Sequence, residues 1–257
     1  MADAAKPLRL GGMALANGLL VHGPGHWSAA IRGSDGEIAV ASGAKPRLRS
    51  LARNIPGLRG LAGMAEAVAV IPLVRRALPE ARLPFESASV LATAGAAALA
   101  GTALRRRGSE AAALFVSLAP SLMALRSGDV AAYHGAEHKT IGAYESGTED
   151  HSKEHDRCGS HLMAPLLIAN AAGLVLLRRA GDHPSQLASS AVSMASFGAA
   201  VEIFAWSERH HDSPAARALR IPGHELQRVI GTREPTADQL AVGRAALDEI
   251  LRVEKAA

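Results

Sequence analysis

Residues 133–139 read Tyr-His-Gly-Ala-Glu-His-Lys, and they contain the spacing His-x-x-Glu-His. On a helix, His134 and His138 project from the same face because they lie four residues apart. Two imidazoles at that spacing can hold one divalent ion, and Glu137 stands beside them as a base for a water at the ion. The stretch therefore predicts a helix that carries a metal site, with Glu137 as its catalytic residue.

Further ligand types follow this stretch. Five of the eleven histidines and the only cysteine lie within residues 134–161. If the helix continues, Glu145 falls on the same face as the first two histidines, while His155 and Cys158 come in the next loop. Zinc is the expected ion, since imidazole and carboxylate ligands suit it. Glu145 or Glu202 as third ligand would leave an open, hydrolytic site, whereas His155 and Cys158 would close a structural His₃Cys site. Both alternatives stay open.

Four apolar runs surround the histidine-rich segment and indicate a membrane protein. They occupy residues 87–104, 111–125, 162–177 and 186–206. Each is close to the lower length limit for a spanning helix, and short basic turns join them into two pairs. We therefore expect two membrane hairpins rather than a soluble helical bundle. Glu202 lies inside the last run, where a carboxylate is functional or paired with an arginine.

Composition and charge agree with a helical membrane protein. The chain of 257 residues is 48% hydrophobic but only 3% aromatic, and its apolar residues are mostly alanine, leucine and valine. Arginines cluster at the ends of the apolar runs, which suits anionic lipid headgroups better than DNA. No signal peptide is evident, so we expect a multi-pass protein of the inner (cytoplasmic) membrane with both termini cytoplasmic.

The two ends of the chain are polar. Short alternating runs at 26–32 and 37–42 around Ser34-Asp35-Gly36 predict a small N-terminal β-hairpin. Near the other end, Thr236 to Gln239 matches a capping box that opens a final helix. Arg233 and Glu234 precede this helix, where they either shape a polar binding pocket or form a local ion pair.

These features predict a mainly α, polytopic membrane protein with about four spanning helices and a single integrated domain. Its segments are 1–59 (hairpin and basic segment), 60–125 (first helical hairpin), 126–161 (histidine-rich helix and loop), 162–206 (second helical hairpin) and 207–257 (polar segment and helix).

Several short motifs resemble a known family. They are residues 11–18, 22–24, 35–38, 56–60, 133–139, 144–145, 155–159 and 232–235, in order over nearly the whole chain. In these stretches the chain resembles the YqhQ-like family of bacterial membrane proteins of unknown function, which are described as predicted metal-dependent enzymes. The resemblance implies a membrane protein and a metal-dependent reaction.

The expected function is that of a metal-dependent membrane enzyme, with hydrolysis as the default reaction and an unidentified substrate. The chain has no G-x-S-x-G motif, P-loop or dinucleotide fingerprint, so serine-hydrolase, ATPase and dehydrogenase functions have no support. The alternative is a non-catalytic membrane factor for assembly or insertion. In that case the histidines would stabilise the 126–161 loop, and the basic segment 45–59 would meet a protein partner or ribosomal RNA.

Overall fold

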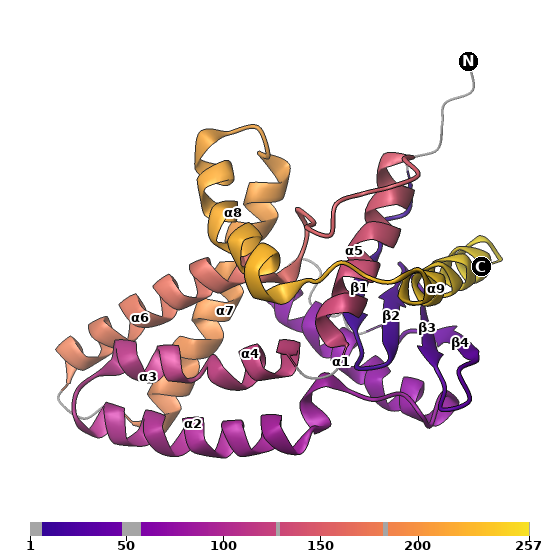
Figure 1. The fold of residues 1–257 in the computed structure, drawn as a ribbon. Coiled ribbons are helices and arrows are strands. Elements are labelled where there is room, and N and C mark those ends of the chain that lie inside the picture. The colour runs from indigo at the N-terminus through magenta and orange to yellow at the C-terminus, as the bar shows by residue number, and fades with distance from the viewer. Residues whose placement is uncertain (1–6, 48–57, 127–128, 182–184, 257) are drawn as a thin grey trace.

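The computed structural model describes residues 7–47, 58–126, 129–181 and 185–256. Its N-terminal part is a four-stranded antiparallel sheet in the sequential order β1-β2-β3-β4 (Figure 1). The strands are β1 (Gly11–Ala14), β2 (Gly18–His22), β3 (His26–Arg32) and β4 (Ile38–Ala44). The predicted hairpin is confirmed as β3 and β4, and Gly36 in its turn has a φ of 86° that glycine adopts without strain.

The sequence predicted only one hairpin, but the sheet has four strands because β1 and β2 pair with that hairpin. Strand β2 is buried on both faces and therefore reads as an unbroken apolar run rather than as an alternating pattern. Leu19 and Val21 point to one face, where Ile250 packs, and Leu20 points to the other, where Val70 packs. The helices on these faces are α5 (Val130–Ser146) and α9 (Ala237–Lys255) on the first, and α1 (Leu58–Ala77) on the second.

We call this sheet with α1, α5 and α9 the base. Helix α9 begins at the predicted capping box: Thr236 accepts from the backbone N–H of Gln239, and the Gln239 side chain accepts from that of Thr236. Most of the basic segment 45–59 falls outside the described residues, which omit 48–57.

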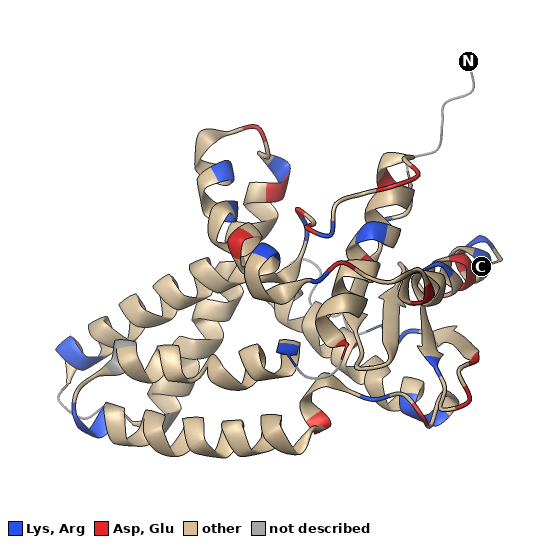
Figure 2. Ribbon diagram, viewed as in Figure 1, with Lys and Arg blue, Asp and Glu red and all other residues tan. Residues whose placement is uncertain are grey.

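The remaining long helices form an arm that extends from the base (Figure 1). They are α2 (Ala88–Arg106), α3 (Glu110–Val116), α4 (Ala119–Arg126), α6 (Met163–Ala180) and α7 (Gln186–Arg209). Helices α2 and α6 carry no charged residue before their terminal arginines, which lie at the far end of the arm (Figure 2). There Arg178 donates to the carbonyls of Arg105 and Gly108, at 3.4 Å each.

Within the described residues, three helices are long and apolar enough to span a membrane: Ala88–Arg106, Gly159–Ala180 and Leu187–Arg209. The expectation of about four was wrong by one, because the run at 111–125 is divided into α3 and α4. In a continuous helix, the backbone N–H of residue 120 would donate to the carbonyl of Val116. Pro120 has no N–H, and its ring would clash with that carbonyl, so α3 ends at Val116. The three helices indicate that the protein is associated with a membrane.

A polar segment connects the arm back to the base. It contains α8 (Pro214–Leu226) and a π-turn, η4 (Gln227–Gly231), after which residues 232–236 run across α5 to the start of α9. Two 3₁₀ turns, η2 (Pro84–Glu86) and η3 (Gly159–Leu162), directly precede α2 and α6. The chain is mainly helical, as expected.

Candidate functional site

His134 and His138 of α5 meet Cys158 at the end of the following loop. The Nε2 atom of His134 lies 3.4 Å from Cys158 Sγ, and the centroids of the two imidazole rings are 4.3 Å apart. One potential ligand atom from each of the three residues lies within 4.8 Å of the others. Zn–N and Zn–S bonds in a tetrahedral site place neighbouring ligand atoms about 3.5 Å apart. The three side chains are therefore spaced almost as ligands of one ion would be.

Each of the two histidines is held by its other ring nitrogen. His134 Nδ1 lies 2.7 Å from the carbonyl of Gly231, and His138 Nδ1 lies 2.6 Å from that of Lys153. A carbonyl oxygen can only accept, so both Nδ1 atoms carry the proton and both Nε2 atoms keep a free lone pair. Metal-binding histidines are oriented in this way by their outer hydrogen bond.

Gly135, between the two histidines, explains how Gly231 reaches His134. The segment after the π-turn lies directly on α5, where Arg233 N donates to the carbonyl of Ala131 at 2.8 Å. A Cβ atom on Gly135 would overlap the Arg233 carbonyl oxygen. The glycine therefore lets residues 231–235 cross the helix closely enough to hold His134 in place.

Cys158 is positioned by Gln227, a fully buried residue of the π-turn. The Gln227 Oε1 atom accepts from His155 N at 2.7 Å, and its Nε2 atom donates to Ser160 Oγ at 2.8 Å. These bonds fix the loop on either side of Cys158. Sequence reasoning missed Gln227, because a lone glutamine before a turn carries no motif; the short π-turn is a feature often found at functional sites.

We call His134, His138 and Cys158 the cluster. Burial is the main cause of the pKa shifts in and beside it. It lowers the pKa of His138 to about 2, with the neighbouring His134 adding to the effect, so His138 stays neutral. It raises the pKa of the Cys158 thiol to about 11. It also raises the pKa of Glu137, although His134 opposes this effect.

Glu137 lies between the histidine pair and strand β1. Its Oε2 atom is 4.0 Å from His134 Nε2, and a Cβ atom on Gly12 would overlap its Oε1 atom. Glu137 is therefore close enough to the cluster to act on a group bound there, and the backbone of β1 limits where its carboxyl group can move.

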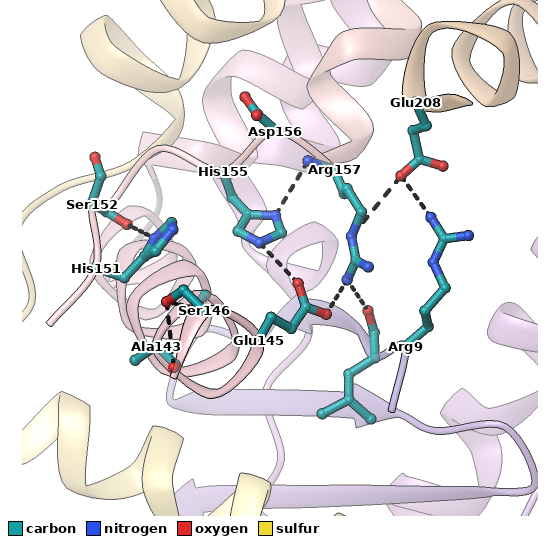
Figure 3. Close-up of polar contacts among 12 residues, drawn as sticks. Arg9, Ala143, Glu145, Ser146, His151, Ser152, His155, Asp156, Arg157 and Glu208 are labelled. Atoms are coloured by element: carbon teal, nitrogen blue, oxygen red, sulfur yellow. Dashed lines mark hydrogen bonds and ion pairs between the residues drawn. The ribbon is translucent and has the colours of Figure 1, made fainter. Parts of the chain in front are cut away.

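Glu145 and His155, two of the predicted ligands, lie beside the cluster in a separate polar network (Figure 3). His155 Nε2 is 3.5 Å from Glu145 Oε2, and its Nδ1 atom accepts from Arg157 N at 3.3 Å. Arg157 forms an ion pair with Glu145. Burial alone would raise the pKa of Glu145, but the hydrogen bond from His155 and the charge of Arg157 together lower it.

The other predicted binding residues point elsewhere. Arg233 Nη2 pairs with Asp129 Oδ1 at 2.9 Å, and Glu234 Oε1 pairs with Lys139 Nζ at 2.7 Å. Both are long-range ion pairs that join the turn to α5 and to Asp129 before it, 95 and 104 residues away in the chain, rather than a local pair within the turn. Glu202 lies in α7 and is not among the residues that line the cavity at the cluster.

A cavity of about 430 Å³ opens at the cluster, within the range typical of small-molecule sites. Its lining comprises Leu10, Gly11, Gly12, Met13, Ala14, Pro84, Phe85, Ser121, Ala124, Leu125, Val130, His134, Glu137, His138, Ile141, His155, Arg157, Cys158, Gly159 and Ser160. The cluster thus faces a hollow between β1, α4 and the turns that precede α2 and α6.

Comparison with known proteins identifies the family. Residues 114–253, more than half of the chain, match the family described as "Protein of unknown function (DUF1385)". The chain belongs to the DUF1385 family. It is also similar to the uncharacterized protein YqhQ of Bacillus subtilis (strain 168), with 29% identity over 129 residues. The aligned part is 48% of this chain and 40% of YqhQ, so it spans less than half of that relative. No solved structure matches the chain significantly.

These matches confirm the predicted resemblance to the YqhQ-like family. The DUF1385 match contains all three potential ligands, Glu137 and the π-turn, whereas the sheet lies outside it.

Proposed function

We propose that this DUF1385 protein is a metal-dependent membrane hydrolase that binds a divalent ion, zinc, through His134, His138 and Cys158. The observation that carries the proposal is the paired orientation of the histidines. Each donates its Nδ1–H to a backbone carbonyl, which leaves Nε2 as the ligand atom, and His134 Nε2 lies 3.4 Å from the Cys158 sulfur.

The donor set fits zinc. Neutral imidazole and thiolate are ligands that Zn²⁺ accepts, and three protein ligands leave one position open for chemistry. His138 is neutral because burial keeps its pKa at about 2. Cys158 is protonated without an ion, since burial raises its pKa to about 11, so binding would release its proton.

A divalent ion in such a site supplies Lewis acidity and lowers the pKa of water. Glu137 would take one proton from the attacking water while the oxygen of that water bonds to the electrophilic atom of the substrate. The bond to the leaving group then breaks, the electron pair departs with that group, and Glu137 returns the proton to it. A raised pKa suits this role, because a base must also be able to give the proton back.

We place the protein in the cytoplasmic membrane with the base on the cytoplasmic side. The sheet and α9 pack against one another, so both terminal segments lie on the same side of the arm. The proposed site needs Cys158 as a free thiol, which a reducing cytosol maintains.

Elemental analysis of the detergent-purified protein tests the site. We expect one zinc ion per chain in the wild type and none in His134→Ala/His138→Ala. The matched control is His210→Ala/His211→Ala, which removes two exposed histidines outside the cluster and should keep the ion. A wild-type protein without stoichiometric metal would overturn the proposal.

The alternative is a non-catalytic membrane factor whose metal site is structural. The observation that favours it is His155, whose ring centroid lies 5.6 Å from that of His138 and would complete a closed His₃Cys set after a side-chain rotation. If the protein is the proposed hydrolase, His155→Ala should leave the ion bound. If the site is a structural His₃Cys site, the same change should release the ion. Glu137→Gln should abolish the cellular role of an enzyme while keeping its zinc, and should be tolerated by a purely structural loop.

A further inference from the structure

We propose that the cavity at the cluster takes the hydrocarbon chain of a membrane lipid and holds the lipid's hydrolysable group against His134, His138 and Cys158. The inference rests on the proposed function and adds to it the class of substrate and its route of entry.

The cavity has two chemically different ends. One end carries the histidine cluster with Glu137, whereas the rest of the wall is mainly apolar. The apolar part comes from β1, η2, α4 and α5, and it includes Met13, Phe85, Ala124, Leu125, Val130 and Ile141. A small polar substrate would leave most of this wall in contact with water, while an acyl chain would cover it.

The apolar wall lies at the level where the membrane helices begin. Phe85 belongs to the turn that leads into α2, and Gly159 opens the candidate span Gly159–Ala180. Leu125 lies in the last turn of α4, which returns from the arm to the base. Phe85 is 57% exposed, and an exposed apolar ring beside a candidate span is suited to contact with lipid. The cavity is thus bordered by the elements at which the candidate spans begin.

The opposite side of the cavity is closed by the polar network of Figure 3. His155 and Arg157 line both the cavity and a second, charged hollow behind it. Arg157 is tied to Glu145, to Glu208 at 4.0 Å and to the carbonyl of Leu10 at 3.0 Å. These side chains form the partition between the two hollows. A lipid would therefore enter from the membrane and not through this charged partition.

The probe is a phosphatidylglycerol with a photoreactive diazirine in the middle of one acyl chain, incorporated into nanodiscs with the full-length protein. After illumination, mass spectrometry locates the labelled peptides. We expect labelling around Met13 and Leu125 as well as around Leu99, which is 77% exposed on α2 and marks ordinary lipid contact.

Ser121→Trp should fill the mouth of the cavity and lower labelling at Met13 and Leu125 by about tenfold, while Leu99 is labelled as before. Ser121 is exposed and lines the cavity, so the change should not disturb folding. The matched control is Ser117→Trp, the same substitution at an exposed position four residues earlier that does not line the cavity. Phe85→Arg, at another exposed position of the mouth, should also lower cavity labelling.

Labelling of Leu99 alone, or cavity labelling that Ser121→Trp and Phe85→Arg leave unchanged, would overturn the inference. Zinc is measured on the same samples. Zinc without cavity labelling overturns only the lipid substrate, whereas cavity labelling without zinc supports the lipid-binding cavity and overturns the hydrolase.

Discussion

Helices α5 and α2 are almost equal in length but bury very different shares of their residues. Of the 17 residues of α5, ten are buried, including Glu137 and His138; of the 19 residues of α2, only Val90 and Gly101 are buried. Yet α2 is the more apolar helix, with alanine, leucine and glycine along most of its length. Hydropathy and burial are therefore inverted between the two helices.

The inversion shows that the two regions are built for different surroundings. The polar groups of α5 can be buried because the fold supplies partners, such as the carbonyls that hold His134 and His138. The leucines of α2 can be exposed without cost only where the surroundings are as apolar as they are. The base is thus stabilised by internal packing and hydrogen bonds, while the arm exposes apolar surface that suits contact with lipid.

The strongest test of the comparison is Gly135→Ala against Gly95→Ala. In the base, a Cβ atom on Gly135 would overlap a backbone carbonyl that cannot move cheaply, so we expect a loss of at least about 3 kcal/mol in the free energy of unfolding. In the arm, Gly95 has no atom within 4 Å of its Cβ position, and alanine should be neutral or slightly stabilising there. Denaturant unfolding in detergent measures both. Equal effects would contradict the distinction.

Leu99→Arg tests whether the arm lies in a membrane. An arginine near the middle of a spanning helix should disfavour insertion by about 3 kcal/mol, whereas on a soluble bundle this exposed position would tolerate it. The control, Ser89→Arg, places the same charge at the exposed start of α2, where it can reach water. The measurement is the fraction of protein recovered in the membrane. Full recovery of the Leu99 variant would count against a spanning α2.

Acid should destabilise the base through His22. Burial, with the nearby charge of Lys45, lowers the pKa of His22 from 6.5 to about 4. The unfolded chain therefore binds a proton below pH 6.5 that the folded chain does not accept until about pH 4. This contribution to stability is fully present above pH 6.5 and is lost as the pH falls, by about 3 kcal/mol at pH 4. Helices α2, α3, α4, α6 and α7 contain no histidine.

The measurement uses a Trp206→Phe background, in which the buried Trp27 of β3 reports unfolding of the sheet. His22→Gln should make the free energy of unfolding less dependent on pH between pH 6.5 and 4. His210→Gln, at an exposed position, should leave this pH dependence unchanged. If the free energy of unfolding of the His22 variant still falls as steeply with pH as that of the parent protein, other groups cause the acid sensitivity.

The smallest effect on stability is expected for Gly12→Ala and Gly11→Ala in β1. A Cβ atom on Gly12 would overlap Oε1, Cδ and Cγ of the flexible Glu137 side chain, which would have to shift within the cavity that it lines, whereas Gly11 has free space. Both variants should fold with changes below about 1 kcal/mol. Only Gly12→Ala should alter the absorption spectrum of a cobalt-substituted site, because only it displaces Glu137 beside the cluster. Identical spectra would show that Glu137 does not influence the ion.

Local patterns in the sequence were sufficient for several elements. The spacing of four residues between His134 and His138 placed both on one face of a helix, and the capping box at Thr236 marked the start of α9. The turn around Gly36 marked the hairpin of β3 and β4. Each of these signals acts between residues close in the chain, where helix and turn geometry is fixed.

Long-range contacts were beyond such patterns. Gln227 and the Gly231 carbonyl lie 72 and 97 residues from the groups that they bind, His155 and His134. The second apolar run, residues 111–125, looked like a span because hydropathy does not register the break that Pro120 makes between α3 and α4.

The sequence by itself determined the helical content, the pairing of two histidines on one face and the apolar character of the arm, because these follow from periodicity and composition. Only the tertiary structure decided which further residues join that pair. It brought Cys158 to His134 and directed Glu145 and His155 towards Arg157. The physical reason is that a loop can place its side chains in many ways, and packing against the π-turn and β1 selects one of them.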